Sequence, residues 1–189
     1  MDEPMPNQQR ILVMDYDPTW PLTFAALRAP ISEALGNIAL AVEHVGSTSV
    51  PGLAAKPIVD IDVVLSSRAE IPAAIEKLAS LGYVHRGDLG IPEREAFDSP
   101  AHLPTHNLYA CVRGSAALAN HLTIRDHLRR NPNAVTAYGQ LKMQLARQFP
   151  TDINSYGVGK TAFLLDVLER EGFSGADLRA IRDAWMRAA

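Results

Sequence analysis

Residues 42–65 read VEHVGSTSVPGLAAKPIVDIDVVL, and this stretch decides the fold. Its second half, IVDIDVVL at 58–65, has the length and the β-branched composition of a single strand. Side chains along a strand point alternately to its two faces, so one face is entirely apolar. That face, which we predict to lie in the core, carries Val59, Ile61, Val63 and Leu65.

The other face of the same strand carries two acids, Asp60 and Asp62. They lie ~6.6 Å apart along the strand. Two carboxylates this close repel each other, and a divalent cation would keep both ionised. Mg²⁺, or Mn²⁺ in its place, suits such a pair because it binds one or two carboxylates together with waters and phosphates. The alternation alone fits a half-exposed strand with two solvated aspartates equally well.

A loop of small residues, GSTSVPG at 46–52, precedes this strand. Gly46 lets the backbone turn sharply and approach a ligand closely. The N–H groups that follow it, with the hydroxyls of Ser47, Thr48 and Ser49, are predicted to cradle a phosphate, although taken alone the segment is also an ordinary turn. Beside two metal-binding carboxylates, it is the apparatus of metal-assisted phosphoryl or nucleotidyl transfer.

Outward from this stretch, the chain divides into an α+β region at 1–113 and a helical region at 114–189, which we expect to pack on each other. Strands are predicted at 10–16, 38–45 and 58–65 and near 83–86, 93–97 and 106–112. Helices are predicted at 18–35, in two pieces because Pro30 interrupts them, and at 67–82, 115–130, 132–148, about 152–172 and 174–188.

The composition is that of an ordinary globular protein, with 189 residues, 47% hydrophobic and 21% charged. Cys111 is the only cysteine, so no internal disulfide forms and a reducing cytoplasm is the expected location. No run approaches the ~18 apolar residues of a membrane span. With a net charge of −3, neither nucleic acid nor a membrane is an expected partner, and the oligomeric state is left open.

Residues 42–61 resemble the signature of the GrpB-like family, which belongs to the nucleotidyltransferase superfamily. Further blocks carry the same resemblance along the chain, namely YDPTW at 16–20, HNLY at 106–109, RDHLRRNP at 125–132, YGQLK at 138–142 and YGVGKTAF at 156–163. The resemblance implies a nucleotidyltransferase-like α+β core with a mixed β-sheet, followed by a C-terminal helical bundle. It also implies that Gly46 and Ser47 hold the triphosphate of a nucleotide, and that Asp60 and Asp62 hold metal and act in catalysis.

Active members of the superfamily usually add a third carboxylate from a neighbouring strand. The matching segment here, THNLY at 105–109, contains no acid. His106 is the candidate for that place, because its ordinary pKa of ~6.5 suits a general base. It could equally serve as a metal ligand or as a structural histidine.

Two tyrosine and lysine pairs in the helical region, Tyr138 with Lys142 and Tyr156 with Lys160, each share a helical face at i,i+4 spacing. The lysines could reach phosphate oxygens, or they could extend from a core edge into water. The family pattern favours the first reading. The nucleotide-binding residues implied by the resemblance therefore include Lys56, Lys142, Tyr156 and Lys160.

Three other patterns are set aside. GKT at 159–161 lacks the earlier glycine and the preceding strand of a phosphate-binding loop. His102 and His106, with Cys111, suggest zinc ligands, but Pro100 and Pro104 prevent the helix that would place both histidines on one side. His121 and His127 are six residues apart on one helix and do not face the same way, so no chemistry is assigned to either.

The function expected from these features is that of a metal-dependent nucleotidyltransferase-like protein. It would bind a nucleoside triphosphate, with ATP as the first candidate, and transfer a nucleotidyl group to an unknown acceptor. The alternative is a non-catalytic accessory module that binds nucleotide or metal. That module would be linked to coenzyme A metabolism, because some family members are fused to dephospho-CoA kinase. A scaffold without a ligand would leave the paired aspartates unexplained.

Overall fold

The fold is built on a mixed five-stranded β-sheet, seen in a computed structural model that describes residues 10–188. The strands are β1 (Ala39–Val45), β2 (Val59–Leu65), β3 (Val84–His85), β4 (Arg94–Asp98) and β5 (His106–Val112). Their order across the sheet is β1-β2-β5-β4-β3. Strands β2 and β5 are parallel and the other neighbours are antiparallel. The expected α+β fold with a mixed sheet is confirmed.

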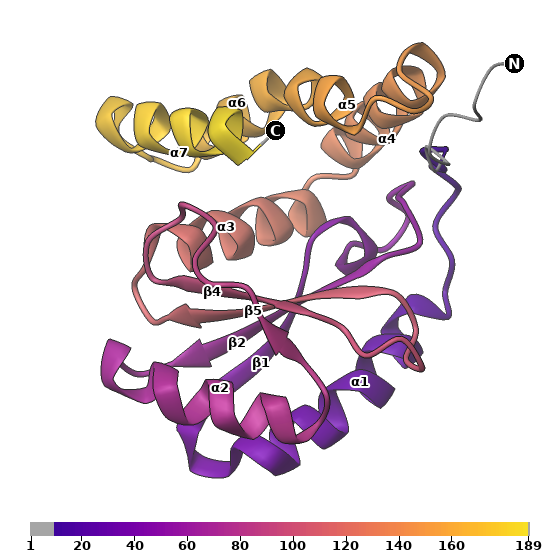
Figure 1. Cartoon of the computed structure of the whole chain (residues 1–189). Helices are drawn as coiled ribbons and strands as arrows, with labels where there is room; N and C mark the ends of the chain where they lie inside the picture. The colour runs from indigo at the N-terminus through magenta and orange to yellow at the C-terminus, as the bar shows by residue number, and fades with distance from the viewer. Residues whose placement is uncertain (1–9, 189) are drawn as a thin grey trace, which may run out of the picture.

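Helices cover both faces of this sheet (Figure 1). One face carries α1 (Trp20–Leu35) and α2 (Ile71–Ser80), and the other carries α3 (Ala116–Arg130). Beyond α3 lies an outer helical layer of α4 (Pro132–Gln148), α5 (Ile153–Gly159), α6 (Thr161–Arg170) and α7 (Gly175–Ala188). Short 3₁₀ turns occur at Gly36–Ile38, Ser47–Ser49 and Arg68–Glu70.

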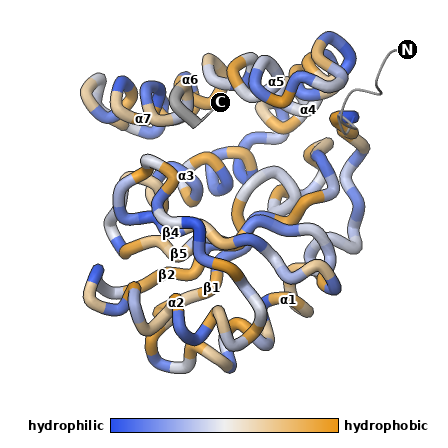
Figure 2. Tube along the Cα trace, in the orientation of Figure 1, coloured by the Kyte–Doolittle hydropathy of each residue, from blue (hydrophilic) through white to orange (hydrophobic). Residues whose placement is uncertain are grey.

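The main core lies between the sheet and the α1/α2 layer. All four apolar residues predicted for one face of β2 belong to it, and each is at most 2% exposed. The opposite face carries a smaller cluster of Val64, Cys111 and Leu118 beneath α3. Figure 2 shows the apolar stretches of the central strands running between these helical layers. The alternation read from the sequence therefore places Asp60 and Asp62 on the α3 side.

A partly buried arginine joins helix α3 to the edge strand β1 of the sheet. The Arg125 side chain is 12% exposed, and its Nη1 donates to Glu43 Oε2 at 2.7 Å and to the backbone oxygen of His44 at 3.1 Å. Because Arg125 bridges α3 and β1 close to the turn at Gly46, it fixes the position of that turn against the helix.

Three sequence predictions are wrong. Residues 10–16 form no strand, only an isolated bridge between Met14 and Ala55, because the segment follows the surface and its Ile11 N–H bonds to Pro150 O instead of to a sheet. Pro30 does not break α1, since the fully buried Ile31 just after it holds the helix to the core. The helix expected at 152–172 is divided, with Lys160 joining α5 to α6.

No helix within residues 10–188 is both long enough and apolar enough to cross a membrane.

Candidate functional site

The site begins at the turn after β1, where Gly46 has φ 67° and ψ −170°. This backbone conformation is rare for residues with a side chain. A Cβ at position 46 would also overlap the carboxylate of Asp60. Glycine is therefore required here for two reasons, and the main chain of the turn lies directly against Asp60.

The three hydroxyl groups after Gly46 point in different directions and have different hydrogen-bond partners. Ser47 Oγ accepts a hydrogen bond of 2.8 Å from Lys142 Nζ and borders two cavities described below. Thr48 Oγ1 is instead bonded to His44 Nε2 at 3.0 Å, and Ser49 Oγ donates to the backbone oxygen of Gly46 at 2.6 Å. Thr48 and Ser49 border neither cavity, because the 3₁₀ turn directs their side chains into the protein. Only Ser47 remains in the predicted phosphate-binding place.

Both aspartates of β2 lie on the α3 side, but their surroundings differ. Asp60 is partly exposed, and its Oδ1 accepts a 2.7 Å hydrogen bond from Asn107 Nδ2 on β5. Asp62 is completely buried, and its Oδ2 forms a 2.8 Å ion pair with His121 Nδ1 on α3. The second oxygen of Asp62, Oδ1, is buried and has no hydrogen-bond partner within residues 10–188.

Burial and charge act in opposite directions on these groups. Burial raises the pKa of the Asp60 carboxyl, while the hydrogen bond from Asn107 and the charge of His121 oppose the rise. Burial lowers the pKa of His121, but the carboxylates of Asp62 and Asp60 outweigh it and leave that pKa above its usual value. The ion pair with Asp62 thus favours the charged imidazolium.

His106, the predicted catalytic base, lies on the other side of the sheet. In the parallel pairing of β2 with β5 it is opposite Val59, and its neighbour Asn107 is opposite Asp60. Both its ring nitrogens are occupied, Nε2 by the Tyr83 hydroxyl at 2.8 Å and Nδ1 by Pro104 O at 2.6 Å. The assignment of His106 to catalysis or metal binding is therefore wrong, because strand alternation carries it to the core face.

A basic cavity of about 190 Å³ adjoins Asp60 and Ser47. Lys56, Lys142 and Lys160 line it, although they come from three distant parts of the chain. The ring centroid of Tyr156 lies 4.7 Å from Lys160 Nζ and 5.8 Å from Lys56 Nζ. The structure thus brings together the lysines and the tyrosine that the sequence analysis selected.

The lysines share this cavity with one acid, Asp60, but form no ion pair with it. None of them forms an ion pair within residues 10–188, and Lys142 is only 2% exposed. Burial, helped by the charge of Lys160, lowers the pKa of Lys142 to about 7. Burial and the nearby Lys56 lower the pKa of Lys160 to about 8. An anion entering the cavity would restore the charged form of both amines.

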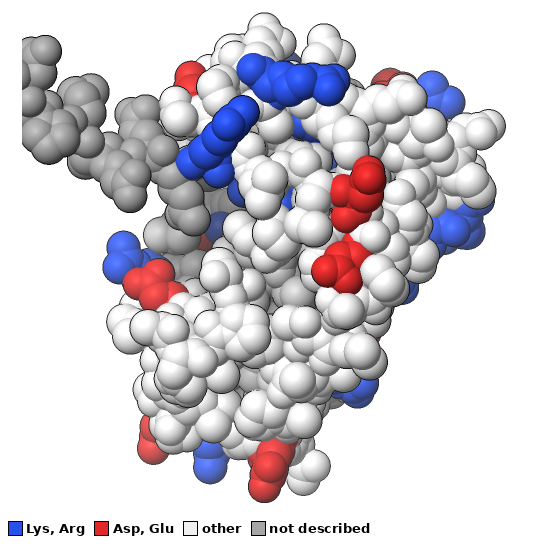
Figure 3. Space-filling model, turned by 90° about the vertical axis from the view of Figure 1, so that its right-hand side faces the viewer, with Lys and Arg blue, Asp and Glu red and all other residues white. Residues whose placement is uncertain are grey.

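Lys142 is buried, whereas Lys56 and Lys160 are partly exposed. On the face of the molecule drawn in Figure 3, Lys and Arg side chains are interspersed with Asp and Glu and form no continuous basic patch.

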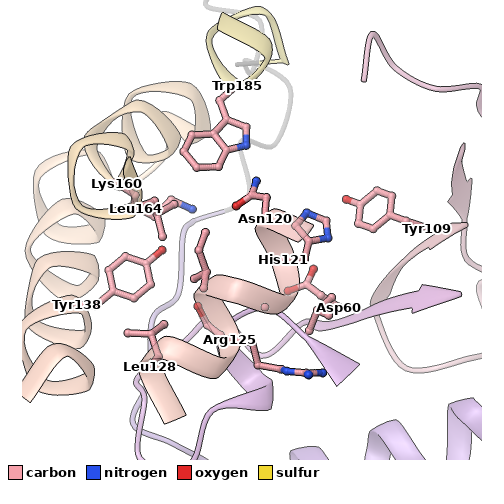
Figure 4. Close-up of a pocket in the computed structure, with 14 residues that line it drawn as sticks. Asp60, Tyr109, Asn120, His121, Arg125, Leu128, Tyr138, Lys160, Leu164 and Trp185 are labelled. Carbon is pink, nitrogen blue, oxygen red and sulfur yellow. The ribbon is translucent and has the colours of Figure 1, made fainter. Parts of the chain in front are cut away.

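A second cavity, of about 250 Å³, lies on the other side of Asp60. It shares Ser47, Asp60 and Lys160 with the basic cavity. Figure 4 shows Asn120 and His121 projecting from α3, with the Trp185 indole approaching from α7 and Tyr109 from β5. Asp60 therefore stands at the border between a basic cavity and a partly aromatic one.

His121 and Asn107, which contact the two aspartates, were not predicted from the sequence as site residues. His121 stands three residues after Leu118 and seven before Leu128, so it shares the helical face by which α3 meets the sheet. That spacing was the available signal for His121. For Asn107, the signal was its place in the strand segment that matched the third-carboxylate position.

Asp60 and Asp62 are the residues that could hold a divalent cation. The unpartnered Oδ1 of Asp62 is an oxygen that such a cation would satisfy, and Asp60 is accessible from both cavities. Within residues 10–188 no group of three His, Cys, Asp or Glu side chains is placed to hold a metal unaided. The donor set therefore fits Mg²⁺ or Mn²⁺ that takes its remaining ligands from water and phosphate.

Comparison with known proteins gives consistent matches. The family model described as GrpB protein matches residues 10–170. UPF0157 protein YqkA of Bacillus subtilis is 32% identical over 157 residues, which cover 83% of this chain but only 46% of YqkA. The chain thus spans about half the length of that relative. A dephospho-CoA kinase of Mycolicibacterium paratuberculosis is 28% identical over 179 residues, covering 82% of this chain and 44% of the kinase.

Solved structures agree with the fold. The crystal structure of GrpB from Enterococcus faecalis matches with a TM-score of 0.76 and 31% identity, over 90% of this chain and 99% of that one. A structure of Cid1 poly(U) polymerase with Mg 3′-dATP bound matches with a TM-score of 0.51 and 14% identity, over 79% and 50% of the two chains. The nucleotidyltransferase-like fold expected from the sequence is confirmed.

Proposed function

The chain belongs to the GrpB family. From that premise we propose that it binds the phosphates of a nucleoside triphosphate in the basic cavity beside Asp60, with ATP as the first candidate. The proposal rests chiefly on one observation: Lys142 is buried, has no acidic partner within residues 10–188, and donates to Ser47 at the mouth of a cavity with two further lysines. A buried ammonium without a counter-ion is costly unless an anion completes the site.

Each residue of the cavity has a role in this proposal. Lys142, Lys160 and Lys56 neutralise phosphate oxygens, and the Ser47 hydroxyl donates to one of them once Lys142 turns to the anion. The Tyr156 ring lies close to the ammonium groups of Lys56 and Lys160 and stabilises them by cation–π attraction. Asp60 and Asp62 would hold Mg²⁺ or Mn²⁺, which supplies charge stabilisation for phosphoryl chemistry when bound.

The reaction that this arrangement supports is nucleotidyl transfer. An acceptor oxygen, approaching from the second cavity, forms a bond to the α-phosphorus. The bond from that phosphorus to the oxygen bridging to the β-phosphate breaks, its electron pair leaves with pyrophosphate, and the acceptor proton passes to water. Asn107, which stands opposite Asp60, is an amide and cannot take this proton at neutral pH.

Asn107 also favours the second candidate function, a non-catalytic module that binds nucleotide or metal. The third carboxylate of active superfamily members would stand where this amide donates to Asp60. A similarity that covers less than half of a dephospho-CoA kinase suits such a role beside a separate catalytic domain, and it motivates the link to coenzyme A metabolism.

Calorimetric titration with ATP, with and without Mg²⁺, tests the proposal. Lys142→Met should weaken binding about ten- to hundred-fold, because charge-assisted hydrogen bonds contribute ~1.5–3 kcal/mol. Lys77→Met, on the exposed side of α2, is the matched control and should change nothing. Asp60→Asn should remove the Mg²⁺-dependent part of the affinity.

Equal ATP affinity in wild type and Lys142→Met would refute phosphate binding in this cavity. Pyrophosphate release in the presence of candidate acceptors then separates the two functions. Release that Asp60→Asn abolishes supports transfer, and tight ATP binding without release supports the accessory module.

A further inference from the structure

Arg94 is a buried arginine without a counter-ion. It is the first residue of β4, lies opposite Cys111 of β5, and is 8% exposed. Within residues 10–188 it forms no ion pair, and its buried Nε has no hydrogen-bond partner. Arginines are almost never buried unless they are paired, because the charge loses its hydration. The guanidinium therefore points to an anion that the chain does not supply.

Its orientation is set by an aromatic ring. The guanidinium carbon lies 4.6 Å from the ring centroid of Tyr109, which holds the flat group against β5. Asp62, on the same face of the sheet, forms its ion pair with His121 and none with Arg94. The edge of the guanidinium remains available, and its planar fork matches a carboxylate or a phosphate.

This arginine borders a cavity of about 340 Å³ between β4 and the outer helices. Lys160 also lines that cavity, so two cations face it. Trp185, Leu164 and Lys160 line both this cavity and the aromatic one beside Asp60. A single ligand could therefore place one end at Asp60 and an anionic group at Arg94.

We propose that Arg94 and Lys160 form an anion-binding subsite, and that the acceptor molecule carries a carboxylate or a phosphate group that binds there. The subsite itself stands on the unpaired guanidinium and the cavity, and only its assignment to the acceptor rests on the proposed function. The Asn120 amide, 4% exposed and with its Oδ1 unpartnered within residues 10–188, lines the aromatic cavity and can accept a hydrogen bond from the same molecule.

NMR of the arginine Nε–Hε groups of the full chain tests the subsite directly. Arg94→Lys identifies the Arg94 signal by removing it, and Arg28, exposed on α1, is the internal control. Sodium acetate and inorganic phosphate are added separately against chloride at constant ionic strength. The expected result is a saturating shift of the Arg94 signal with one or both anions, several-fold larger than the shift of Arg28. The anion that binds more tightly, acetate or phosphate, identifies the anionic group of the ligand as a carboxylate or a phosphate.

The same titration in Lys142→Met separates this site from the basic cavity. The response of Arg94 should persist there, and it should weaken in Lys160→Met. An Arg94 shift no larger than that of Arg28, or one that disappears in Lys142→Met, would overturn the subsite. If ATP binding fails to depend on Lys142 while the Arg94 response stands, the proposed nucleotide site fails and the anion subsite survives.

Discussion

Replacing Lys142 by methionine should stabilise the unliganded protein. Burial lowers the pKa of this lysine from 10.5 to about 7, so at pH 7 the folded state loses about 4 kcal/mol relative to a neutral side chain of the same shape. The hydrogen bond to Ser47 and the Tyr138 ring, 4.6 Å away, offset part of that cost. A net gain of about 2 kcal/mol is expected, which raises Tm by about 4–8 °C.

The gain should depend on pH with a definite sign. The folded-state pKa of Lys142 is lowered, so between pH 7 and about 10 the unfolded chain keeps a proton that the folded wild type has lost. The stability of wild type therefore rises with pH relative to the variant, by up to about 1.4 kcal/mol per pH unit. The advantage of Lys142→Met should be largest at pH 7 and below, and it should shrink by pH 9.

Urea denaturation of wild type, Lys142→Met and Lys77→Met from pH 6 to 9.5 measures the difference in unfolding free energy between each variant and wild type. When the denaturation is repeated with ATP, wild type should become more stable than Lys142→Met, because a ligand stabilises only the protein that binds it. The reasoning is refuted if Lys142→Met is less stable than wild type at pH 7 and the difference is the same at every pH. That result would mean that Lys142 is an ordinary stabilising contact.

Three further changes test other parts of the site. Gly46→Ala should cost more stability than Gly52→Ala in urea titrations, because both positions have positive φ, worth about 1–3 kcal/mol of strain, but only position 46 lies against Asp60; equal costs would show that the close approach is unimportant. His106→Gln should leave ATP affinity unchanged in calorimetry, since the ring lies on the core face, and a large loss would restore it to the site. His121→Gln should destabilise by about 3–5 kcal/mol, because it leaves the buried Asp62 charge unpaired; in a double-mutant cycle, adding Asp62→Asn should recover much of that loss, and additive effects would contradict the ion pair.

Much of the site could be read from local sequence. The alternation of IVDIDVVL determines which face of β2 is core and which carries Asp60 and Asp62, because strand side chains have a period of two whatever surrounds them. The need for glycine at position 46 was likewise readable, as the residue between a strand and a turn of small residues. Helical spacing marked Lys142 and Lys160 as residues that share faces with tyrosines.

Other features depend on how distant segments meet. Whether His106 or Asn107 faces Asp60 is decided by the register of β5 against β2, and one residue of slip would exchange them. The continuity of α1 through Pro30 depends on the core contacts of Ile31, which outweigh a local break signal.

The amino-acid sequence by itself therefore determined the central strand β2, the glycine turn after β1 and the chemical groups offered on each face of β2, since these follow from backbone geometry and side-chain period. Only the tertiary structure decided that His121 pairs with Asp62, that three distant lysines share one cavity, and that Arg94 is buried without a counter-ion. Burial and pairing are properties of what packs around a group, and in this chain the packing partners lie tens of residues away.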